Sequence, residues 1–314
     1  MNASNQLNRF VRSRWFFLVV AVVVCMRFAS AGDFAPVALP VAKPGIPRRL
    51  ELILGMGEET RYRPRIRAVH ALGRQLSEQE VAALLWFLHR KKGDDPLPLE
   101  YLNPIKNDIV NALLRQERPP RELGAHLIAM FRDGEQDAVW RDYCVQFLGV
   151  WYPRVGSPSE RAEIRKVFDE ALGVSGSDRP GPKGEPDHRP RSVRATVGTA
   201  LIALSNLVDE PDIDRDEVGR KACAVACDSD AGNAARISAF GVCARLGCRD
   251  CLGEARKLAA GPGSATLRMS CIAAIGALGN RSDLPLLERC RQSRDIRLRT
   301  AAKSGIEQVG RRTR

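Results

Sequence analysis

Small and apolar side chains recur along this chain in seven copies of one pattern. Each copy begins at a basic residue and has small or apolar residues three, six and seven positions later, usually with another at position ten. Such offsets fall on one stripe of a helix, so each copy predicts an α-helix with one buried face. The basic residues that begin the copies are Arg65, Lys106, Arg141, Arg194, Arg236, Arg268 and Arg299.

A second helix fits between successive copies. The copies begin roughly 30 to 50 residues apart, the spacing of helical-hairpin repeats. Ser77 with Glu80, and Ser157 with Glu160, have the spacing of a capping box. Because a helix pair cannot bury its apolar face alone, neighbouring pairs are expected to stack into one core. The stretches that predict the second helices are 81–89, 123–131, 164–172, 218–226, 252–258 and 284–290.

The last three copies carry a signal for the helix end. Gly247, Gly279 and Gly310 each stand eleven residues after the arginine of their copy. Glycine at this place commonly adopts the left-handed conformation that closes the last turn. We therefore predict left-handed caps at these three glycines.

The repeated pattern resembles that of the HEAT-repeat family. The resemblance is strongest at 230–247, 266–279 and 295–310, where an Asp or a loop leads into a small or apolar residue, an Arg and an Ala/Leu stripe. Residues 61–76 (RYRPRIRAVHALGRQL) look like a further copy. The resemblance spans about residues 61–310 and implies an all-α fold, a right-handed α-solenoid of about seven HEAT-like helical hairpins. It also implies recognition of another protein along a concave surface.

The composition divides the chain into six segments. Proline density favours an extended tether after the N-terminal segment, and the many Gly and Pro residues at 175–192 exclude a packed helix there. The segments are 1–31, a signal peptide; 32–50, a Pro-rich tether; 51–174, N-terminal HEAT-like repeats; 175–192, a Gly/Pro-rich loop; 193–310, C-terminal HEAT-like repeats; and 311–314, a basic tail.

The N-terminal segment has the three parts of a secretory signal. Arg9, Arg12 and Arg14 precede an apolar stretch at 15–26, and Ala29-Ser30-Ala31 follows as a small-residue cleavage site. This stretch is shorter than the roughly 20 residues that span a bilayer. We predict an exported protein, periplasmic or secreted, with no membrane span after cleavage. An anchor formed by the uncleaved segment and a cytosolic protein are the alternatives.

The chain is basic, with a formal net charge of +12. Removal of residues 1–31 leaves 45 basic and 37 acidic residues, a net charge of +8. Basic residues cluster at 48–74, which includes Arg61 and Arg63, and at 289–314. These ends either bind an anionic polymer or form a solvated surface, and we favour the second because charge runs are commonly solvated. We do not expect nucleic acid as a partner, because an exported protein seldom meets it and aromatic residues are not interleaved with these arginines.

Three cysteines belong to the repeated stripe. Eight of the nine cysteines follow residue 31, and Cys144, Cys243 and Cys271 occupy apolar positions of their copies. Cysteine is among the most buried residue types and packs as a small hydrophobic side chain. We therefore expect these three in the core.

The chemical state of four other cysteines has three possible interpretations. Cys223 and Cys227 lie one turn apart on a predicted helix, and Cys248 and Cys251 share a turn further along. They are reduced structural thiols, or form at least one disulfide among Cys227, Cys248 and Cys251, or hold zinc with all four. Zinc requires that all four converge, so it is the least favoured interpretation and we assign no metal site.

No catalytic pattern stands out in the sequence. His70, His89, His126 and His188 are scattered, and the chain has no HExxH motif, no phosphate-binding loop and no GxSxG motif. We predict no catalytic residue, no cofactor and no enzymatic activity. The alternative is a helical-repeat enzyme of a lyase-like kind, because relatives of this broad class include enzymes.

Two aromatic residues are candidates for contact with a partner. Trp140 and Tyr143 lie near the edge of the third stripe, where aromatic side chains either anchor an interface or enter the core. We favour burial and retain both as candidate partner-binding residues, together with Arg61 and Arg63. The sequence as a whole predicts an exported, non-enzymatic scaffold that binds another protein; a polyanion-binding protein is the first alternative.

We predict cleavage close to Ala31 in the native host, because the basic, apolar and small-residue parts of a signal stand in order. N-terminal sequencing of the protein made in that host measures this directly. A product that still begins at Met1 contradicts it.

Overall fold

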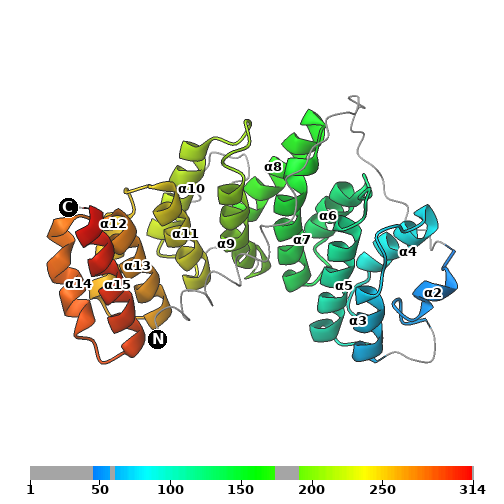
Figure 1. Cartoon of the computed structure of the whole chain (residues 1–314), viewed down its shortest axis with the longest axis horizontal. Helices are drawn as coiled ribbons and strands as arrows, with labels where there is room; N and C mark the ends of the chain where they lie inside the picture. Colours follow the sequence, from blue (N-terminus) through cyan, green and yellow to red (C-terminus); the bar gives the residue numbers. More distant parts are fainter. Residues whose placement is uncertain (1–44, 57–60, 174–190, 313–314) are drawn as a thin grey trace. The chain divides into compact units, whose positions relative to one another are not determined.

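All seven copies of the repeated pattern fold as α-helices. The computed structural model describes residues 45–56, 61–173 and 191–312, and within them it contains fourteen α-helices and no strand (Figure 1). The expected all-α class is confirmed. The helices are α2 (Arg48–Glu51), α3 (Tyr62–His70), α4 (Glu78–Leu88), α5 (Leu99–Leu114), α6 (Leu123–Arg132), α7 (Ala138–Trp151), α8 (Pro158–Leu172), α9 (Arg191–Asn206), α10 (Arg215–Cys227), α11 (Asn233–Leu246), α12 (Leu252–Ala260), α13 (Ala265–Leu278), α14 (Leu284–Arg291) and α15 (Ile296–Arg312), with 3-10 turns at Tyr152–Arg154 and Arg281–Asp283.

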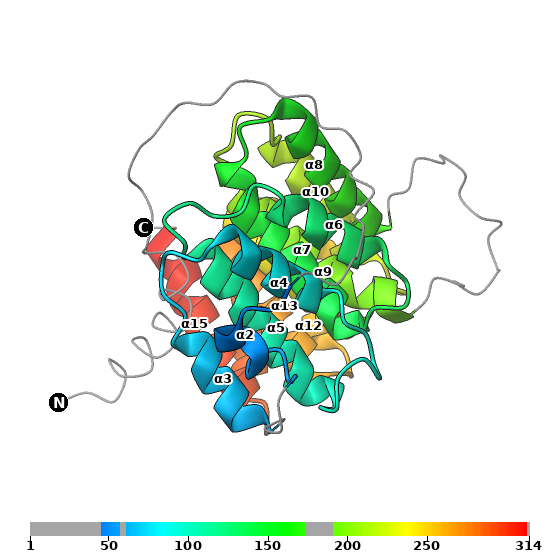
Figure 2. The same cartoon turned by 90° about the vertical axis from the view of Figure 1, so that its right-hand side faces the viewer.

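The pattern copies are the odd-numbered helices α3 to α15, and the intervening stretches are the even-numbered helices α4 to α14. Each odd helix from α5 onward packs against the even helix before it and against the next odd helix. Figure 2 views these helices from the end at which α2 and α3 lie. One apolar core therefore runs through helices that are far apart in the sequence, from Leu50 to Val309.

The predicted helix starts and ends are partly correct. Ser77 and Glu80 form the expected capping box, whereas Ser157 caps α8 alone because the carboxylate of Glu160 accepts from the Trp151 indole instead. Gly247 is left-handed as predicted, with φ of 81°. The other two glycine caps are wrong. Gly279 ends α13 in an extended conformation, and Gly310 lies inside α15, which continues to Arg312.

Three predicted segments fall mainly outside the described residues. The signal peptide at 1–31 and most of the tether at 32–50 lie there, and so does 175–190 of the Gly/Pro-rich loop. Helix α2 begins at Arg48, within the predicted tether, and α9 begins at Arg191, within the predicted loop. No helix in the described parts is long and apolar enough to cross a bilayer.

In the six copies whose basic side chain is described, that side chain donates to backbone carbonyls in or just beyond the helix before it. In three copies the guanidinium donates to a carbonyl in the last turn of the preceding even helix. The final carbonyls of a helix have no partner within that helix, so an outside donor satisfies them. These donor and acceptor pairs are Arg141 with Phe131 (2.6 Å), Arg236 with Ala226 (3.1 Å) and Arg268 with Ala259 (3.1 Å).

Three further copies reach carbonyls just beyond the preceding helix. The side chain of Arg194, which begins the remaining copy, is outside the described part. In these six copies the basic side chain therefore ties its helix either to the last turn of the preceding helix or to the segment that follows that helix. The pairs are Arg65 with Ile53 (3.0 Å), Lys106 with Arg90, and Arg299 with Ser293 and Arg294 (both 3.0 Å).

Two of these basic residues lie fully in the core. The guanidinium of Arg65 makes a two-pronged ion pair with Asp95 at 2.7 and 2.8 Å, and both side chains are completely buried. Lys106 donates to the side chain of Gln136 at 3.3 Å and lies over the Trp140 ring. Burial lowers the pKa of Lys106 to about 8, because it penalises the charged ammonium.

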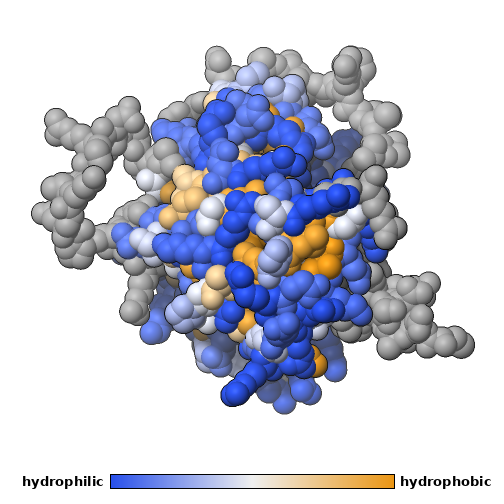
Figure 3. All heavy atoms as spheres, turned by 90° about the vertical axis from the view of Figure 1, so that its left-hand side faces the viewer, coloured by the Kyte–Doolittle hydropathy of each residue, from blue (hydrophilic) through white to orange (hydrophobic). Residues whose placement is uncertain are grey.

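The C-terminal helix has a largely polar outer surface. Arg297, Lys303 and Glu307 are exposed on α15, while Ala302 and Val309 face the core. Figure 3 shows hydrophilic residues around an apolar patch on the side where α14 and α15 lie.

Small residues let neighbouring odd helices approach closely. A Cβ atom on Gly276 of α13 would stand 2.7 Å from the Cα of Gly305 on α15, and one on Gly198 of α9 would stand 2.8 Å from the Ser238 hydroxyl on α11. A side chain at Gly276 would meet rigid backbone, so the helices would have to separate.

We predict that Gly276→Ala lowers the free energy of unfolding by about 1 to 3 kcal/mol, because the added methyl group overpacks the contact between α13 and α15. Gly241→Ala is the matched control within a helix. Nothing lies within 4 Å of a Cβ there, so it should stabilise by about 0.5 to 1 kcal/mol. Chemical denaturation measures both, and two changes of the same sign would contradict the assignment.

Candidate functional site

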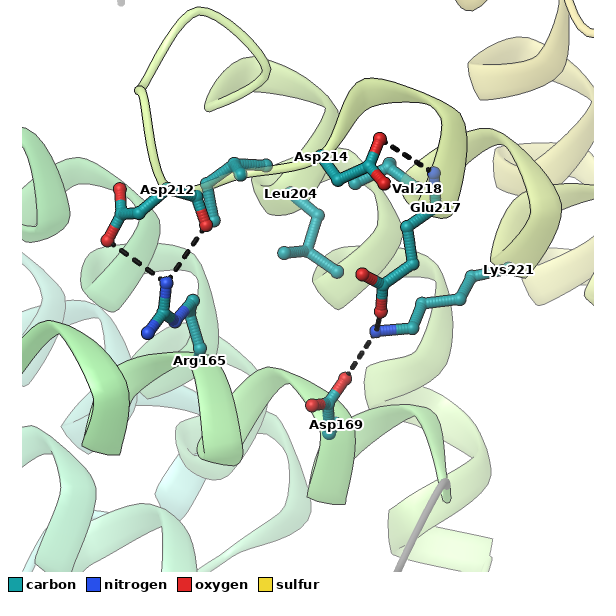
Figure 4. A pocket seen from close by; sticks show the side chains of 9 residues that line it. Arg165, Asp169, Leu204, Asp212, Asp214, Glu217, Val218 and Lys221 are labelled. Carbon is teal, nitrogen blue, oxygen red and sulfur yellow. Dashed lines mark hydrogen bonds and ion pairs between the residues drawn. The ribbon is translucent and has the colours of Figure 1, made fainter.

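A pocket of about 240 Å³ lies between α8, α9 and α10 (Figure 4). Helix α8 supplies two charged residues and α10 supplies two more, while the loop before α10 closes one side. The lining combines a charged rim with an apolar wall. Its residues are Arg165, Asp169, Leu204, Asp212, Ile213, Asp214, Glu217, Val218 and Lys221.

Ion pairs fix the rim on the side of α10. The ammonium of Lys221 lies 2.7 Å from Asp169 of α8 and 2.7 Å from Glu217 of its own helix. Burial acts against the charged ammonium, but the hydrogen bonds to Asp169 and Glu217 outweigh it and raise the pKa of Lys221. Lys221 therefore stays charged and links α8 to α10.

Asp212 is held from the other side of the rim. Arg165 donates to its carbonyl at 2.9 Å and to its carboxylate at 3.2 Å, Arg161 donates at 3.0 Å, and the Tyr152 hydroxyl donates at 2.7 Å. Burial opposes ionisation of Asp212, but the Tyr152 hydrogen bond and the charge of Arg161 outweigh it, so the pKa of Asp212 is lowered. Burial and the bond to Asp212 raise the pKa of Tyr152.

The pocket carries a surplus of negative charge. Four carboxylates and two basic groups line it, and no His, Cys, Ser, Thr or Tyr is among the lining residues. Asp214 is engaged as the cap of α10, where it accepts from the backbone of Asp216 and Glu217. The arrangement suits a cationic group with an apolar stem, because Leu204, Ile213 and Val218 provide the apolar wall.

The aromatic candidates lie mostly in the core. Trp140 is completely buried, and its indole donates to the sulfur of Met130 at 3.3 Å. Tyr143 is half-buried and contacts Trp140 edge-on, with ring centroids 6.4 Å apart. Trp140 thus has no surface to offer a partner in this conformation, and only Tyr143 reaches solvent.

The two candidate arginines are on the surface. Arg61 is the N-cap residue of α3, and Arg63 is exposed in its first turn. Their neighbour Arg65 points into the core, so the basic run at 48–74 is only partly a surface feature. At the other end, Arg291, Arg297 and Arg311 pair with nearby acids.

The cysteines form a different group from the one expected. The Sγ atoms of Cys223, Cys243 and Cys248 all lie within 4.8 Å of one another, and Cys251 is buried beside them. Cys227 is exposed and outside this group. The eight described cysteines are free thiols. Cys144, Cys243 and Cys271 are in the core as predicted.

The local electrostatics differ among these thiols. Hydrogen bonds from Cys223 and Cys243 favour the thiolate of Cys251 and lower its pKa. Burial raises the pKa of Cys248 to about 11. The group therefore contains one thiol that ionises more readily than its neighbours.

Two histidines that look unrelated in the sequence meet in the structure. The Nε2 atom of His89, just after α4, lies 2.8 Å from the Nδ1 atom of His126 in α6. Sequence reasoning missed this pair, because no pattern in the sequence joins the end of α4 to the first half of α6. Burial, followed by the charge of His126, lowers the pKa of His89 to about 4.

Comparisons with family models, with curated proteins and with solved structures found no match for this chain.

We predict that stability falls as the pH drops from about 6.5 to about 4, by up to about 3 kcal/mol from His89 alone. The unfolded chain binds a proton at the ordinary pKa of histidine, whereas folded His89 resists protonation until about pH 4. Denaturant titrations of the wild type and His89→Gln across this range isolate the contribution. Equal slopes against pH in the two proteins would contradict it.

Proposed function

We propose that this chain is an exported, non-enzymatic scaffold that binds another protein, built as a right-handed α-solenoid of HEAT-like helical hairpins. The pattern of helix contacts supports the solenoid. Each odd helix from α5 to α13 packs against the next odd helix, and each odd helix from α5 to α15 packs against the even helix before it. Further support comes from the basic side chain that, in six described copies, donates to a carbonyl in or just beyond the preceding helix. Export is supported by the signal-like segment at 1–31.

The main support for a binding function is the pocket between α8, α9 and α10. Its net negative lining and apolar wall fit the end and stem of a lysine or arginine side chain. Such a side chain, presented by a partner protein, would exchange its water for rim carboxylates that are already oriented by Lys221 and Arg165. The pocket would therefore anchor a basic segment of the partner.

The same contacts favour binding over catalysis. A general acid or base works best when its pKa lies near the working pH. Asp212 has a lowered pKa, and Lys221 holds both Asp169 and Glu217. These groups are thus suited to bind charge, and less suited to exchange protons. Exposed Arg61 and Arg63 support the anionic-polymer alternative.

We predict that Glu217→Lys weakens capture of the partner at least tenfold, about 1.4 kcal/mol, because it reverses charge at the rim. The mature protein serves as bait in its native compartment, and quantitative mass spectrometry reads the partners. Asp216→Lys is the matched control. It reverses a neighbouring charge in the same first turn of α10 but does not line the pocket.

An equal loss with Asp216→Lys, or no loss with Glu217→Lys, would contradict the pocket assignment. Salt-sensitive retention on heparin that Arg61→Ala and Arg63→Ala abolish would favour the anionic-polymer alternative. Turnover of a small molecule by the purified protein would favour an enzyme.

A further inference from the structure

Three thiols converge at the junction of α10, α11 and α12. The Sγ atoms of Cys223, Cys243 and Cys248 lie within 4.8 Å of one another, and those of Cys223 and Cys243 are 3.5 Å apart. Zinc binds thiolate sulfur at about 2.3 Å, which puts the sulfurs of a tetrahedral site about 3.8 Å apart. The observed spacing brackets this value, so small side-chain rotations suffice to place one ion among them.

A fourth thiol completes the set. Cys251 is fully buried at the N-cap position of α12. Its thiol donates to the carbonyl of Cys248 at 3.8 Å, which holds it in the same turn as one member of the group. Cys223, Cys243 and Cys251 are buried and Cys248 is half-buried, and four thiolates are the ligand set of a structural zinc ion.

The backbone brings these residues together independently of their thiols. Gly247 ends α11 in the left-handed conformation, and the amide of Cys248 then donates to the carbonyl of Cys243 at 3.0 Å. This turn folds Cys248 back over the end of α11. Cys223 comes from α10, which packs against α11 along its length. The site is therefore positioned by three separate elements.

We propose that Cys223, Cys243, Cys248 and Cys251 form a binding site for a thiophilic divalent cation of the Zn²⁺ type. Binding replaces the thiol protons with metal–sulfur bonds and releases up to four protons to solvent. No oxidant or reductant takes part. The ion would fasten α10, α11 and the start of α12 to one another and stabilise the C-terminal helices. This inference is independent of the proposed binding function.

Cys227 distinguishes this site from the set that sequence spacing suggested. It lies one turn from Cys223 on α10, yet it is exposed and outside the convergent group. Cys243, from the neighbouring helix, takes its place. Cys227 is therefore a matched control for every ligand substitution.

The test uses the mature full-length protein, reduced and then equilibrated with Zn²⁺, with metal content measured after removal of unbound ion. One zinc per chain is expected. Cys223→Ser and Cys248→Ser should each weaken binding at least about tenfold, and Cys227→Ser should leave it unchanged. Co²⁺ in place of zinc should give the sulfur-to-metal charge-transfer absorption of a thiolate site.

If a variant fails to fold, the wild-type protein alone still tests the proposal. Chelation of the metal should lower its Tm, and added Zn²⁺ should restore it, which requires no substitution. The proposal would be overturned if the reduced protein bound only trace zinc, or if Cys227→Ser weakened zinc binding as much as the ligand substitutions. A Tm that did not change on chelation would also overturn it. A Cys223–Cys243 disulfide that forms again in the presence of Zn²⁺ would overturn it as well.

Discussion

The unpaired carbonyls at the end of each helix impose the constraint on which this structure depends. An unsatisfied buried carbonyl costs about 1 to 3 kcal/mol, and the Ala226 carbonyl near the end of α10 accepts its bond from Arg236 in the buried interior. Three copies meet this cost with one basic side chain each: Arg141 for α6, Arg236 for α10 and Arg268 for α12. The same side chain thereby links its helix to the one before it. Part of the basic character of the chain is thus internal and structural.

This constraint explains why some features could be read from the sequence. The stripe and the basic residue that begins it lie on one helix, so their spacing alone placed all seven odd helices. The second helices and the Ser77 cap could also be predicted, because they depend on residues close together in the sequence. Helix ends were harder, because Gly279 and Gly310 look like Gly247 in sequence, and only the chain that follows them decides whether the helix stops.

Features that join two helices could not be predicted in this way. Spacing within α10 put Cys223 and Cys227 on one side, but only the packing of α10 on α11 shows that Cys223 faces Cys243. The contact between His89 and His126 depends on the packing of two separate elements in the same way. The pocket residues of α8 and α10 come from helices that α9 separates in the sequence, so no local spacing places them together. Helix α10 carries both a pocket wall and one cysteine of the thiol group, so a metal ion there would stiffen the pocket.

The claim that basic side chains act by capping carbonyls is tested most directly at Arg236. This residue donates both to the Ala226 carbonyl and to the Glu254 carboxylate, so two substitutions separate the roles. The free energy of unfolding should fall by about 1 to 3 kcal/mol more in Arg236→Met than in Glu254→Gln, because only the first variant leaves the Ala226 carbonyl without its donor. Equal losses in the two variants, or a loss below about 0.5 kcal/mol in Arg236→Met, would contradict the account.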